Sequence, residues 1–208
     1  MNGVVASVRA ARPGEEEWAA PHVIAAVPWF AFADLFDEDA PPLAGIIQRA
    51  RAMTSSPIVT VNVWFDRRVI DEPFVGLPGR AMQWVFDKPG AFGEDASHLS
   101  LVSSGASPIG SLTNAQLIAL ATKELLDALP AARGARLLRA TVVREPRATF
   151  SLAPGQPARP ATETPVRGLL LAGDWIETAL PATIESAVRA GHRAADIALG
   201  HRVIESFL

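Results

Sequence analysis

Residues 169–195, LLLAGDWIETALPATIESAVRAGHRAA, contain the strongest indication of the fold in this sequence. Three leucines and an alanine are typical of a short buried strand, and Gly173-Asp174 ends that strand. The pattern then predicts a helix that opens at Pro181 and runs to Leu199, with Gly200 as its C-terminal cap. Because the helix follows the strand closely, we expect it to pack on a sheet, which gives the fold class α/β.

The start of this helix is a candidate ligand site. The first N–H groups of a helix are unpaired and carry a partial positive charge, so they can hold an anionic or electron-rich group. Asp174 precedes them, where its carboxylate could accept hydrogen bonds from ligand hydroxyls. An ordinary turn in which Asp174 only caps the loop uses the same residue types. Both interpretations stay open on spacing alone.

The rest of the chain predicts a mixed sheet with helices. Val4, Val5 and Val8 belong to a short strand, and residues 22–27 form a buried strand that Pro28 stops. Further strands are expected at 58–65, 82–86, 99–102 and 137–143, and helices at 41–53 and 114–129.

Two local patterns are especially regular. Residues 58–65 alternate, which predicts one buried and one more polar face of a strand. Thr113 and Gln116 have the spacing of a capping box before the second helix, and Pro130 stops that helix. The side expected in the core holds Val59, Val61, Val63 and Phe65, and the other side holds Thr60, Asn62 and Trp64.

Composition excludes several function classes. The 208 residues are 49% hydrophobic and 20% charged, with a net charge of −3, which argues against a chain built to bind nucleic acid. The absence of cysteine excludes disulfides, thiolate catalysis and cysteine-based metal sites. The four histidines have no ligand-like spacing, so we expect no metal site.

No targeting or membrane-spanning segment is visible in the sequence. The longest apolar stretch, residues 23–35, is interrupted by Pro28 and Asp34, and a spanning helix needs about 20 apolar residues. The lack of cysteine suits a reducing cytoplasm. We therefore expect a cytoplasmic protein. A mean hydropathy of +0.20 leaves room for a peripheral contact at the inner face of the cell membrane.

Several stretches resemble one enzyme family. LLLAGDW (169–175) and LPATIESAVRAG (180–191) resemble the C-terminal flavin-binding motif of the FAD-dependent amine oxidase and phytoene desaturase superfamily. MQWVFDK (82–88) points to its squalene-associated FAD-dependent desaturases, the hydroxysqualene dehydroxylases of hopanoid biosynthesis. VIAAVPW (23–29), HLSLV (98–102) and RATFS (147–151) extend the resemblance over nearly the whole chain.

The resemblance implies FAD as the cofactor. Asp174 would hydrogen-bond its ribityl or pyrophosphate part, and the backbone of residues 183–185 would lie against the pyrimidine edge of the isoalloxazine. There the helix start would stabilise negative charge that develops as the flavin is reduced. The implied cofactor-binding residues are Val27, Pro28, Gly173, Asp174, Trp175, Pro181, Ala182, Thr183, Ile184 and Glu185.

The resemblance also implies an apolar substrate tunnel, which suits a long isoprenoid. Trp64, Trp84 and Phe86 would bind this hydrophobic substrate, with strand 58–65 helping to line the tunnel. No catalytic residue is identified, and no acid for a leaving hydroxyl is evident. The chain departs from the family at Ser186, where many members carry glycine, and at residues 176–179, where a Thr- and Gly-rich loop is common.

The sequence lacks the GxGxxG segment with which the family binds the FAD diphosphate. We therefore expect the C-terminal part of an amine-oxidase-like fold that binds FAD weakly or not at all by itself. A missing N-terminal FAD-binding half or a partner subunit would complete the protein. The expected parts are flavin-domain strands at 1–36, a substrate-binding region at 37–150 and the C-terminal FAD-binding motif and helix at 151–208.

Three functions remain open at this point. By resemblance, the complete protein would convert hydroxysqualene to squalene, drawing electrons from a reductant. A carotenoid-type desaturase of phytoene would use the flavin in the opposite direction, and the residues do not fix that direction. The third is a non-catalytic fragment or subunit that binds an isoprenoid or a partner chain.

Overall fold

The computed structural model describes residues 8–9, 16–36, 40–88 and 97–201, and the chain divides into two compact units. The first unit comprises residues 1–54 and 150–208, and the second comprises residues 55–149. Each unit has a hydrophobic core of its own. The division groups residues 40–54 with the first unit, whereas the sequence predicted a boundary near residue 36. Val4 and Val5 lie outside the described residues.

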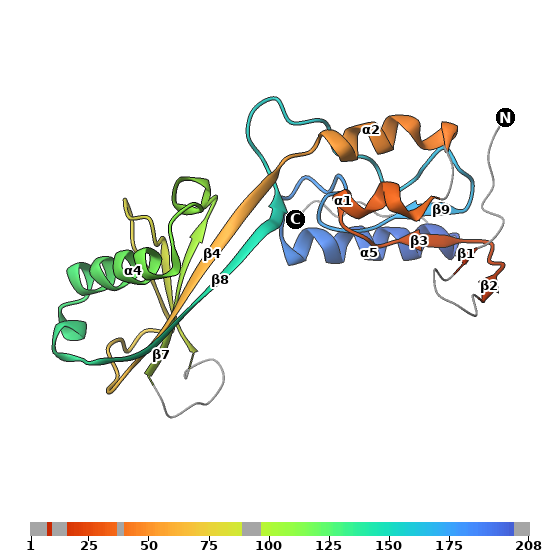
Figure 1. The fold of residues 1–208 in the computed structure, drawn as a ribbon. Coiled ribbons are helices and arrows are strands. Elements are labelled where there is room, and N and C mark those ends of the chain that lie inside the picture. Colours follow the sequence, from red (N-terminus) through yellow and green to blue (C-terminus); the bar gives the residue numbers. More distant parts are fainter. Residues whose placement is uncertain (1–7, 10–15, 37–39, 89–96, 202–208) are drawn as a thin grey trace. The chain divides into compact units, whose positions relative to one another are not determined.

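The first unit is built on a short parallel sheet (Figure 1). Strand β3 (Val23–Ala25) pairs in parallel with β9 (Leu169–Leu171) along its whole length. A separate antiparallel pair joins β1 (Val8–Arg9) to β2 (Glu17–Trp18). The helices of this unit are α1 (Trp29–Phe32), α2 (Ala44–Ala52) and α5 (Ile184–Ala198).

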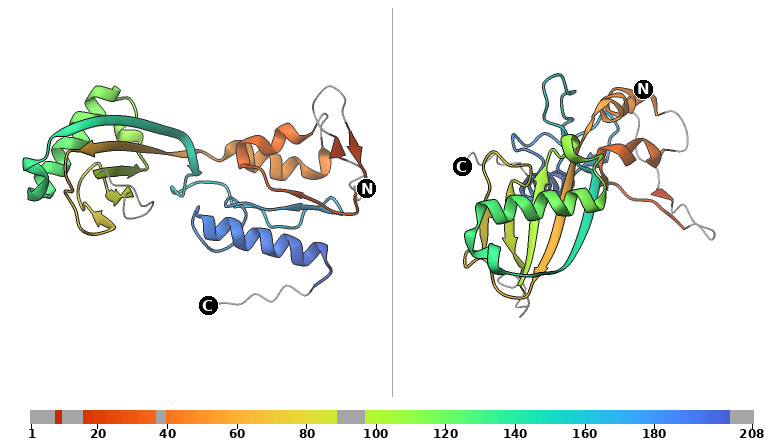
Figure 2. Two further views of the ribbon diagram at one scale, coloured as in Figure 1. Left: turned by 90° about the horizontal axis from the view of Figure 1, so that it is seen from below. Right: turned by 60° about the vertical axis from the view of Figure 1, so that its left-hand side comes forward.

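Both faces of the parallel pair are covered, which explains why β9 is apolar throughout. Leu169 and Leu171 pack in one cluster with aromatic residues of α1 and apolar residues of α2. Leu170 packs in another cluster with Ala194 of α5. The left view of Figure 2 shows α1 and α2 on one side of the strands and α5 on the other. The predicted α/β class is therefore confirmed.

The helix after β9 begins later than the sequence predicted. The prediction of Pro181 as its first residue is wrong, because the helix begins at Ile184 and Pro181 lies in the preceding loop. Thr183 is the N-cap, and its hydroxyl accepts a hydrogen bond from the N–H of Ser186 at 3.2 Å. The predicted C-terminal cap is confirmed, since Gly200 has a φ of +71° and its N–H donates to the carbonyl of Ile197.

The strand expected over residues 22–27 is shorter than predicted. It comprises only the three residues of β3, and the chain turns at Pro28 into the four-residue helix α1. Pro28 is extended and forms the N-cap of α1, so the same proline that ends the strand starts a helix that the sequence did not predict. The predicted helix at 41–53 is present, as a 3-10 turn at Pro41–Leu43 that continues into α2.

The second unit is a five-stranded sheet in the order β5-β6-β7-β4-β8. The pairs β5–β6, β6–β7 and β7–β4 are antiparallel. Helix α4 (Asn114–Ala128) lies across one face of this sheet, as the right view of Figure 2 shows. The strands are β4 (Ser55–Phe65), β5 (Phe74–Gly76), β6 (Trp84–Asp87), β7 (Ser97–Ser104) and β8 (Leu137–Phe150).

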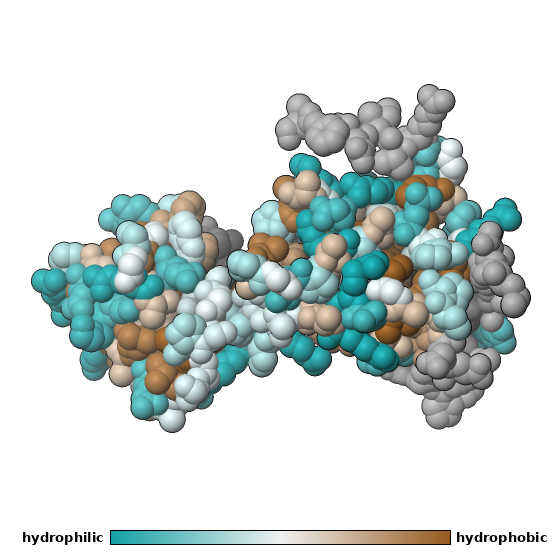
Figure 3. All heavy atoms as spheres, turned by 90° about the horizontal axis from the view of Figure 1, so that it is seen from above, coloured by the Kyte–Doolittle hydropathy of each residue, from teal (hydrophilic) through white to brown (hydrophobic). Residues whose placement is uncertain are grey.

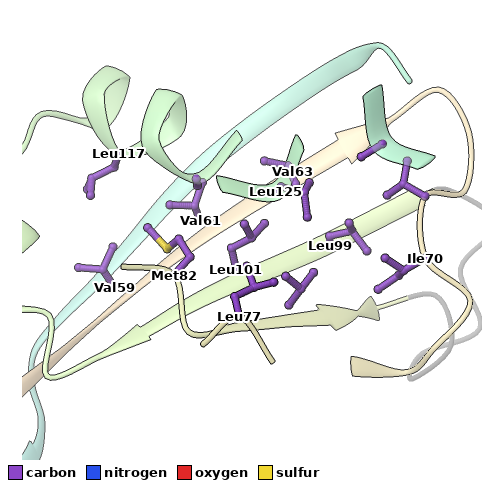
Figure 4. Packing of buried hydrophobic residues seen from close by; sticks show 14 of the residues in the cluster. Val59, Val61, Val63, Ile70, Leu77, Met82, Leu99, Leu101, Leu117 and Leu125 are labelled. Carbon is purple, nitrogen blue, oxygen red and sulfur yellow. The ribbon is translucent and has the colours of Figure 1, made fainter. Parts of the chain in front are cut away.

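The core of the second unit lies between the sheet and α4 (Figure 4). The alternation predicted for residues 58–65 is confirmed, because Val59, Val61 and Val63 are at most 2% exposed and point into this core. Leu117 and Leu125 of α4 are fully buried against them. The predicted capping box is confirmed as well, since Thr113 and Gln116 exchange backbone-to-side-chain hydrogen bonds. Residues 60, 62 and 64 therefore occupy the opposite face, which we call the open face.

Strand β8 extends well beyond its predicted end. It has 14 residues and runs to Phe150, whereas the sequence predicted a strand over residues 137–143, and it includes Pro146. An edge strand can accommodate proline because one row of its backbone groups faces away from the sheet, and β8 lies at the edge.

Among the described residues, no helix is long and apolar enough to cross a membrane. Figure 3 shows hydrophobic residues reaching the surface in both units.

Candidate functional site

The carboxyl ends of the two parallel strands create the first candidate site. Parallel strands end at the same edge of a sheet, and ligands of α/β proteins bind at that edge. Val27 and Pro28 follow β3, and Gly173 and Asp174 follow β9. The indole nitrogen of Trp175 donates to the carbonyl of Val27 at 2.8 Å, which ties the two segments together. The structure thus brings together four of the residues that the sequence grouped.

Trp175 was expected to contact the cofactor, but its side chain lies in the hydrophobic core. Its side chain is fully buried and packs against Phe32, with 5.6 Å between the ring centroids. Gly173 has a φ of +137°, and a Cβ there would lie 3.1 Å from the Trp175 ring. Trp175 therefore positions the Gly173–Asp174 turn from inside the core and offers no side-chain surface to a ligand.

The N-terminus of α5 presents open hydrogen-bond donors. The N–H groups of Ile184 and Glu185 donate to no other residue in the described part of the chain. Ile184 is 86% exposed, so an apolar side chain stands beside these donors. The buried hydroxyl of Ser186 donates to the carbonyl of Asp174 at 3.2 Å, which fixes the helix start next to the strand end.

The other predicted residues of this helix start lie in or beside the loop. Pro181 and Ala182 precede the N-cap, and the carbonyl of Pro181 accepts a hydrogen bond from the Thr183 hydroxyl at 3.2 Å. The Glu185 carboxylate pairs with Arg189 one turn further along, with 2.8 Å between Oε1 and Nε. The side chain of Glu185 therefore lies along the helix surface. This does not affect the expected role of Glu185, because that role belongs to its backbone.

A group of side chains that the sequence analysis missed holds the loop before α5. Arg159 donates to both carboxylate oxygens of Glu177, at 3.2 and 2.9 Å, and to the carbonyl of Leu180 at 2.7 Å. The hydroxyls of Thr178 and Ser186 lie 2.6 Å apart in the buried interior. Arg159 comes from a Pro- and Ala-rich loop, and its partner is 18 residues away. No local pattern marks such a pair.

The carboxyl group of Asp174 is half-buried. Burial raises the pKa of Asp174 above its usual value of 3.8. Its own N–H, the N–H of Trp175 and the charge of Arg159 act in the opposite direction. A carboxylate that has lost water gains more from an incoming hydroxyl donor than an exposed carboxylate does. This suits Asp174 to bind ligand hydroxyls.

The second candidate site is the open face of the five-stranded sheet. Trp84 pairs with Val102, which pairs with Thr60, so Trp84 shares a face with Trp64. Phe74, Trp84 and Phe86 form an exposed aromatic cluster, with ring centroids 6.0 to 6.4 Å apart and exposures of 54%, 43% and 38%. The three residues predicted to bind substrate, Trp64, Trp84 and Phe86, therefore lie on one face.

Trp64 differs from the other two in its surroundings. Its ring stacks on the imidazole of His98, with 4.1 Å between centroids. The guanidinium of Arg139 lies 4.8 Å from the centre of the same ring. Because β4 lies between β7 and β8 in the sheet, Trp64 is flanked by a partner from each neighbouring strand. Trp64 is thus in contact with a polar ring and a charged group, whereas Trp84 and Phe86 contact other aromatic rings.

The sequence matches a known family over most of its length. The profile described as "Flavin containing amine oxidoreductase" matches residues 2–199. A hydroxysqualene dehydroxylase of Sinorhizobium fredii is 34% identical over 143 residues, which cover 68% of this chain and 32% of that protein. The enzyme of the same name from Rhodopseudomonas palustris is 40% identical over 125 residues, 60% of this chain and 28% of that protein. The 15-cis-phytoene desaturase of Solanum lycopersicum is 28% identical, over 69% of this chain and 27% of that enzyme.

Solved structures share the fold. An oxidoreductase from Methanosarcina mazei superposes with a TM-score of 0.65 at 18% identity, over 87% of this chain and 44% of that one. A putative protoporphyrinogen oxidase from Exiguobacterium gives a TM-score of 0.63 at 15% identity, over 94% and 45%. The chain thus spans about a third of its curated relatives and under half of these structures. From the profile match and the shared fold, the chain belongs to the family of flavin-containing amine oxidoreductases.

Proposed function

We propose that this chain supplies the isoalloxazine-binding and substrate-binding parts of an FAD-dependent oxidoreductase that converts hydroxysqualene to squalene. The observation that carries the proposal is the pairing of two features in one chain. One is the site at the carboxyl ends of β3 and β9 and the N-terminus of α5, in a chain that belongs to a family of flavin-containing enzymes. The other is an exposed aromatic face on a separate sheet, which suits a long hydrocarbon. Relatives 34% and 40% identical carry the name hydroxysqualene dehydroxylase.

The residues at the edge of β3 and β9 fit the redox end of FAD. The open N–H groups of Ile184 and Glu185 stand where a helix start favours negative charge, and Asp174 is placed to accept from hydroxyls. The exposed Ile184 side chain, Val27 and Pro28 offer apolar contact to a flat ring. A segment with a GxGxxG turn, absent from this sequence, would hold the diphosphate.

The proposed reaction replaces the allylic C–OH bond of the substrate with a C–H bond. Hydroxide leaves and takes a proton to become water, while a hydride equivalent reaches the carbon. A two-electron donor such as a reduced nicotinamide would supply the electrons, and FAD held at the edge of β3 and β9 would supply the hydride-transfer chemistry. Residues 184 and 185 and Asp174 would orient the cofactor, while the aromatic cluster would hold the apolar chain and exclude water from it.

The experiment supplies the chain with the portion of the Sinorhizobium fredii relative that it does not cover. The reconstituted protein is incubated with FAD, a reduced nicotinamide and hydroxysqualene, and squalene is measured by mass spectrometry. We expect squalene from the pair and none from either part alone. Absence of squalene from a pair that retains flavin would overturn the proposal.

The likeness to 15-cis-phytoene desaturase makes oxidation of phytoene the second candidate. Parallel reactions with phytoene and an electron acceptor in place of the reductant separate the two. Products with additional conjugated double bonds, detected by their visible absorbance, would favour the desaturase. Squalene from the reductive arm alone would favour the dehydroxylase.

We also propose that the protein works at the inner face of the cell membrane, because its substrate would be dissolved in lipid. The exposed Phe74, Trp84 and Phe86 give the described surface an apolar region. Cosedimentation with phosphatidylglycerol–phosphatidylethanolamine vesicles tests this proposal. Replacing Phe74 and Trp84 by serine should reduce the bound fraction, and an unchanged fraction would contradict membrane contact through this cluster.

A further inference from the structure

A small polar group lies on the open face beside the aromatic cluster. The hydroxyl of Ser100 donates to Oδ1 of Asn62 at 2.5 Å, and Nε2 of His98 lies 3.3 Å from the same oxygen. We call these three residues the Asn62 cluster. Ser100 is only 2% exposed, so its hydrogen bond to Asn62 is shielded from water, whereas Asn62 itself is partly exposed. Such bonds hold the Asn62 side chain in one orientation.

The strand register places this cluster directly next to the aromatic residues. Phe86 lies opposite Ser100, and Ser100 lies opposite Asn62, so the three side chains form one row across β6, β7 and β4. Side chains opposite each other on paired strands have Cβ atoms about 4.5–5.5 Å apart. A ligand that lies along this row therefore meets aromatic carbon first and the Asn62 amide next.

The Asn62 amide retains unused donors. Its oxygen accepts from Ser100 and lies within bonding distance of His98, whereas its nitrogen donates to no other residue in the described ranges. An amide nitrogen carries two N–H groups. A pure hydrocarbon seated here would strip water from these donors without replacing the hydrogen bonds, which is unfavourable. An alcohol would offer its oxygen to them.

We propose that the Asn62 cluster binds the hydroxyl group of an isoprenoid alcohol whose hydrocarbon chain lies on Phe74, Trp84 and Phe86. This inference rests on the proposed function and refines it, because it names the residues that select an alcohol over a hydrocarbon. Asn62 is the contact residue. Ser100 is a positioning residue that acts through the Asn62 oxygen, and Trp64 holds the His98 ring by stacking.

The test is a pair of ligand titrations on the full chain, followed by NMR. Hydroxysqualene and squalene are each delivered in the same nonionic detergent. The sequence has three asparagines and four glutamines, so the side-chain amide spectrum contains few signals, and the signal that Asn62→Asp removes belongs to Asn62. We expect hydroxysqualene to shift this signal and squalene to leave it in place. The Asn114 signal serves as an internal reference, since that side chain binds Arg144 on the surface.

Two substitutions measure the preference itself. In the unchanged chain we expect hydroxysqualene to bind about tenfold more tightly than squalene, the size of one well-formed hydrogen bond. Asn62→Leu has a similar volume but no polar atom for the alcohol hydroxyl, and Ser100→Ala removes the hydrogen bond that holds the Asn62 amide in place. Both should reduce the preference to about twofold or less. Ser104→Ala, the same change on an exposed residue of the same strand, should keep it.

The outcomes separate this inference from the proposed function. Equal binding of the two ligands, or saturation without a shift of the Asn62 signal, overturns the role of the Asn62 cluster even if the reconstituted enzyme makes squalene. A clear alcohol preference that Asn62→Leu abolishes supports the role, even if the reconstituted enzyme makes no squalene. Absence of squalene in that case would overturn the proposed reaction, while the role of the Asn62 cluster in binding an alcohol would stand.

Discussion

Asp174 combines a cost in stability with a proposed role in cofactor binding. Its pKa is raised in the folded chain, chiefly by burial, so the neutral acid is favoured over the carboxylate. Stability that depends on the neutral form is present at low pH and is lost as the pH rises through the raised pKa. The ionised group at neutral pH therefore opposes folding, as functional groups often do.

Asp174→Asn removes this ionisation and should raise the stability at pH 7. We expect the advantage of the variant to grow as the pH rises above 3.8 and through the raised pKa of Asp174, because only the unchanged chain loses stability there from this group. Urea unfolding at several pH values measures the difference. An advantage that shrinks as the pH rises would contradict the assignment.

Trp175 illustrates a residue whose motif position suggests contact with a ligand and whose side chain belongs to the core. Trp175→Phe keeps most of the packing but leaves the carbonyl of Val27 without its donor. We expect a loss of about 1–3 kcal/mol in the free energy of unfolding. Trp84→Phe, at a side chain 43% exposed, should cost less than about 0.5 kcal/mol. Equal losses for the two variants, measured by urea denaturation, would show that the Trp175 bond contributes nothing.

At the scale of single elements, the two long helices begin in the same way. Thr113 and Thr183 both cap through their hydroxyls. Thr113→Ala removes the side-chain half of a capping box and should cost about 1 kcal/mol of stability. Ser111→Ala, at an exposed residue just before the cap, is the matched control. A chain that tolerates both changes equally would show that tertiary packing alone fixes the start of α4.

Elements whose signals are local could be predicted from the sequence. The alternation of residues 58–65 and the capping box before α4 depend on neighbours within four positions, and both are confirmed. The sequence predicted the start of α5 three residues too early. Pro181 and Thr183 can each stand at the start of a helix, and the hydrogen bond from the Ser186 N–H to the Thr183 hydroxyl is what identifies Thr183 as the cap. The length of β8 was missed because its pairing with β4 is not a local property.

The candidate site shows the same limit. The chain order of Val27–Pro28 and Gly173–Asp174 suggested two strand ends, and the parallel pairing brought them together. The Arg159–Glu177 pair and the Asn62 cluster join residues 18 to 38 positions apart. Such contacts depend on the register of strands and the course of loops. No residue spacing in the sequence encodes them.

At the scale of the whole molecule, the two units have separate cores, and a core defect should remain local. Leu101→Ala empties a fully buried position of the second unit and should cost about 2–5 kcal/mol. Hydrogen exchange should then show lost protection within residues 55–149, while β3, β9 and α5 keep theirs. Leu138→Ala, at a side chain 56% exposed, is the control. An equal loss in both units would mean that they unfold as one.

In the function that we propose, the edge of β3 and β9 beside α5 holds the redox end of FAD. The most direct measurement is an FAD titration, followed by flavin fluorescence, of the chain supplied with the missing portion of the Sinorhizobium fredii relative. We predict saturable binding that Asp174→Asn weakens about tenfold, the size of one hydrogen bond to a charged group. Asp71→Asn, at a side chain 94% exposed, should leave the affinity unchanged. Binding of equal strength in all three proteins, or no binding in any, would contradict the claim.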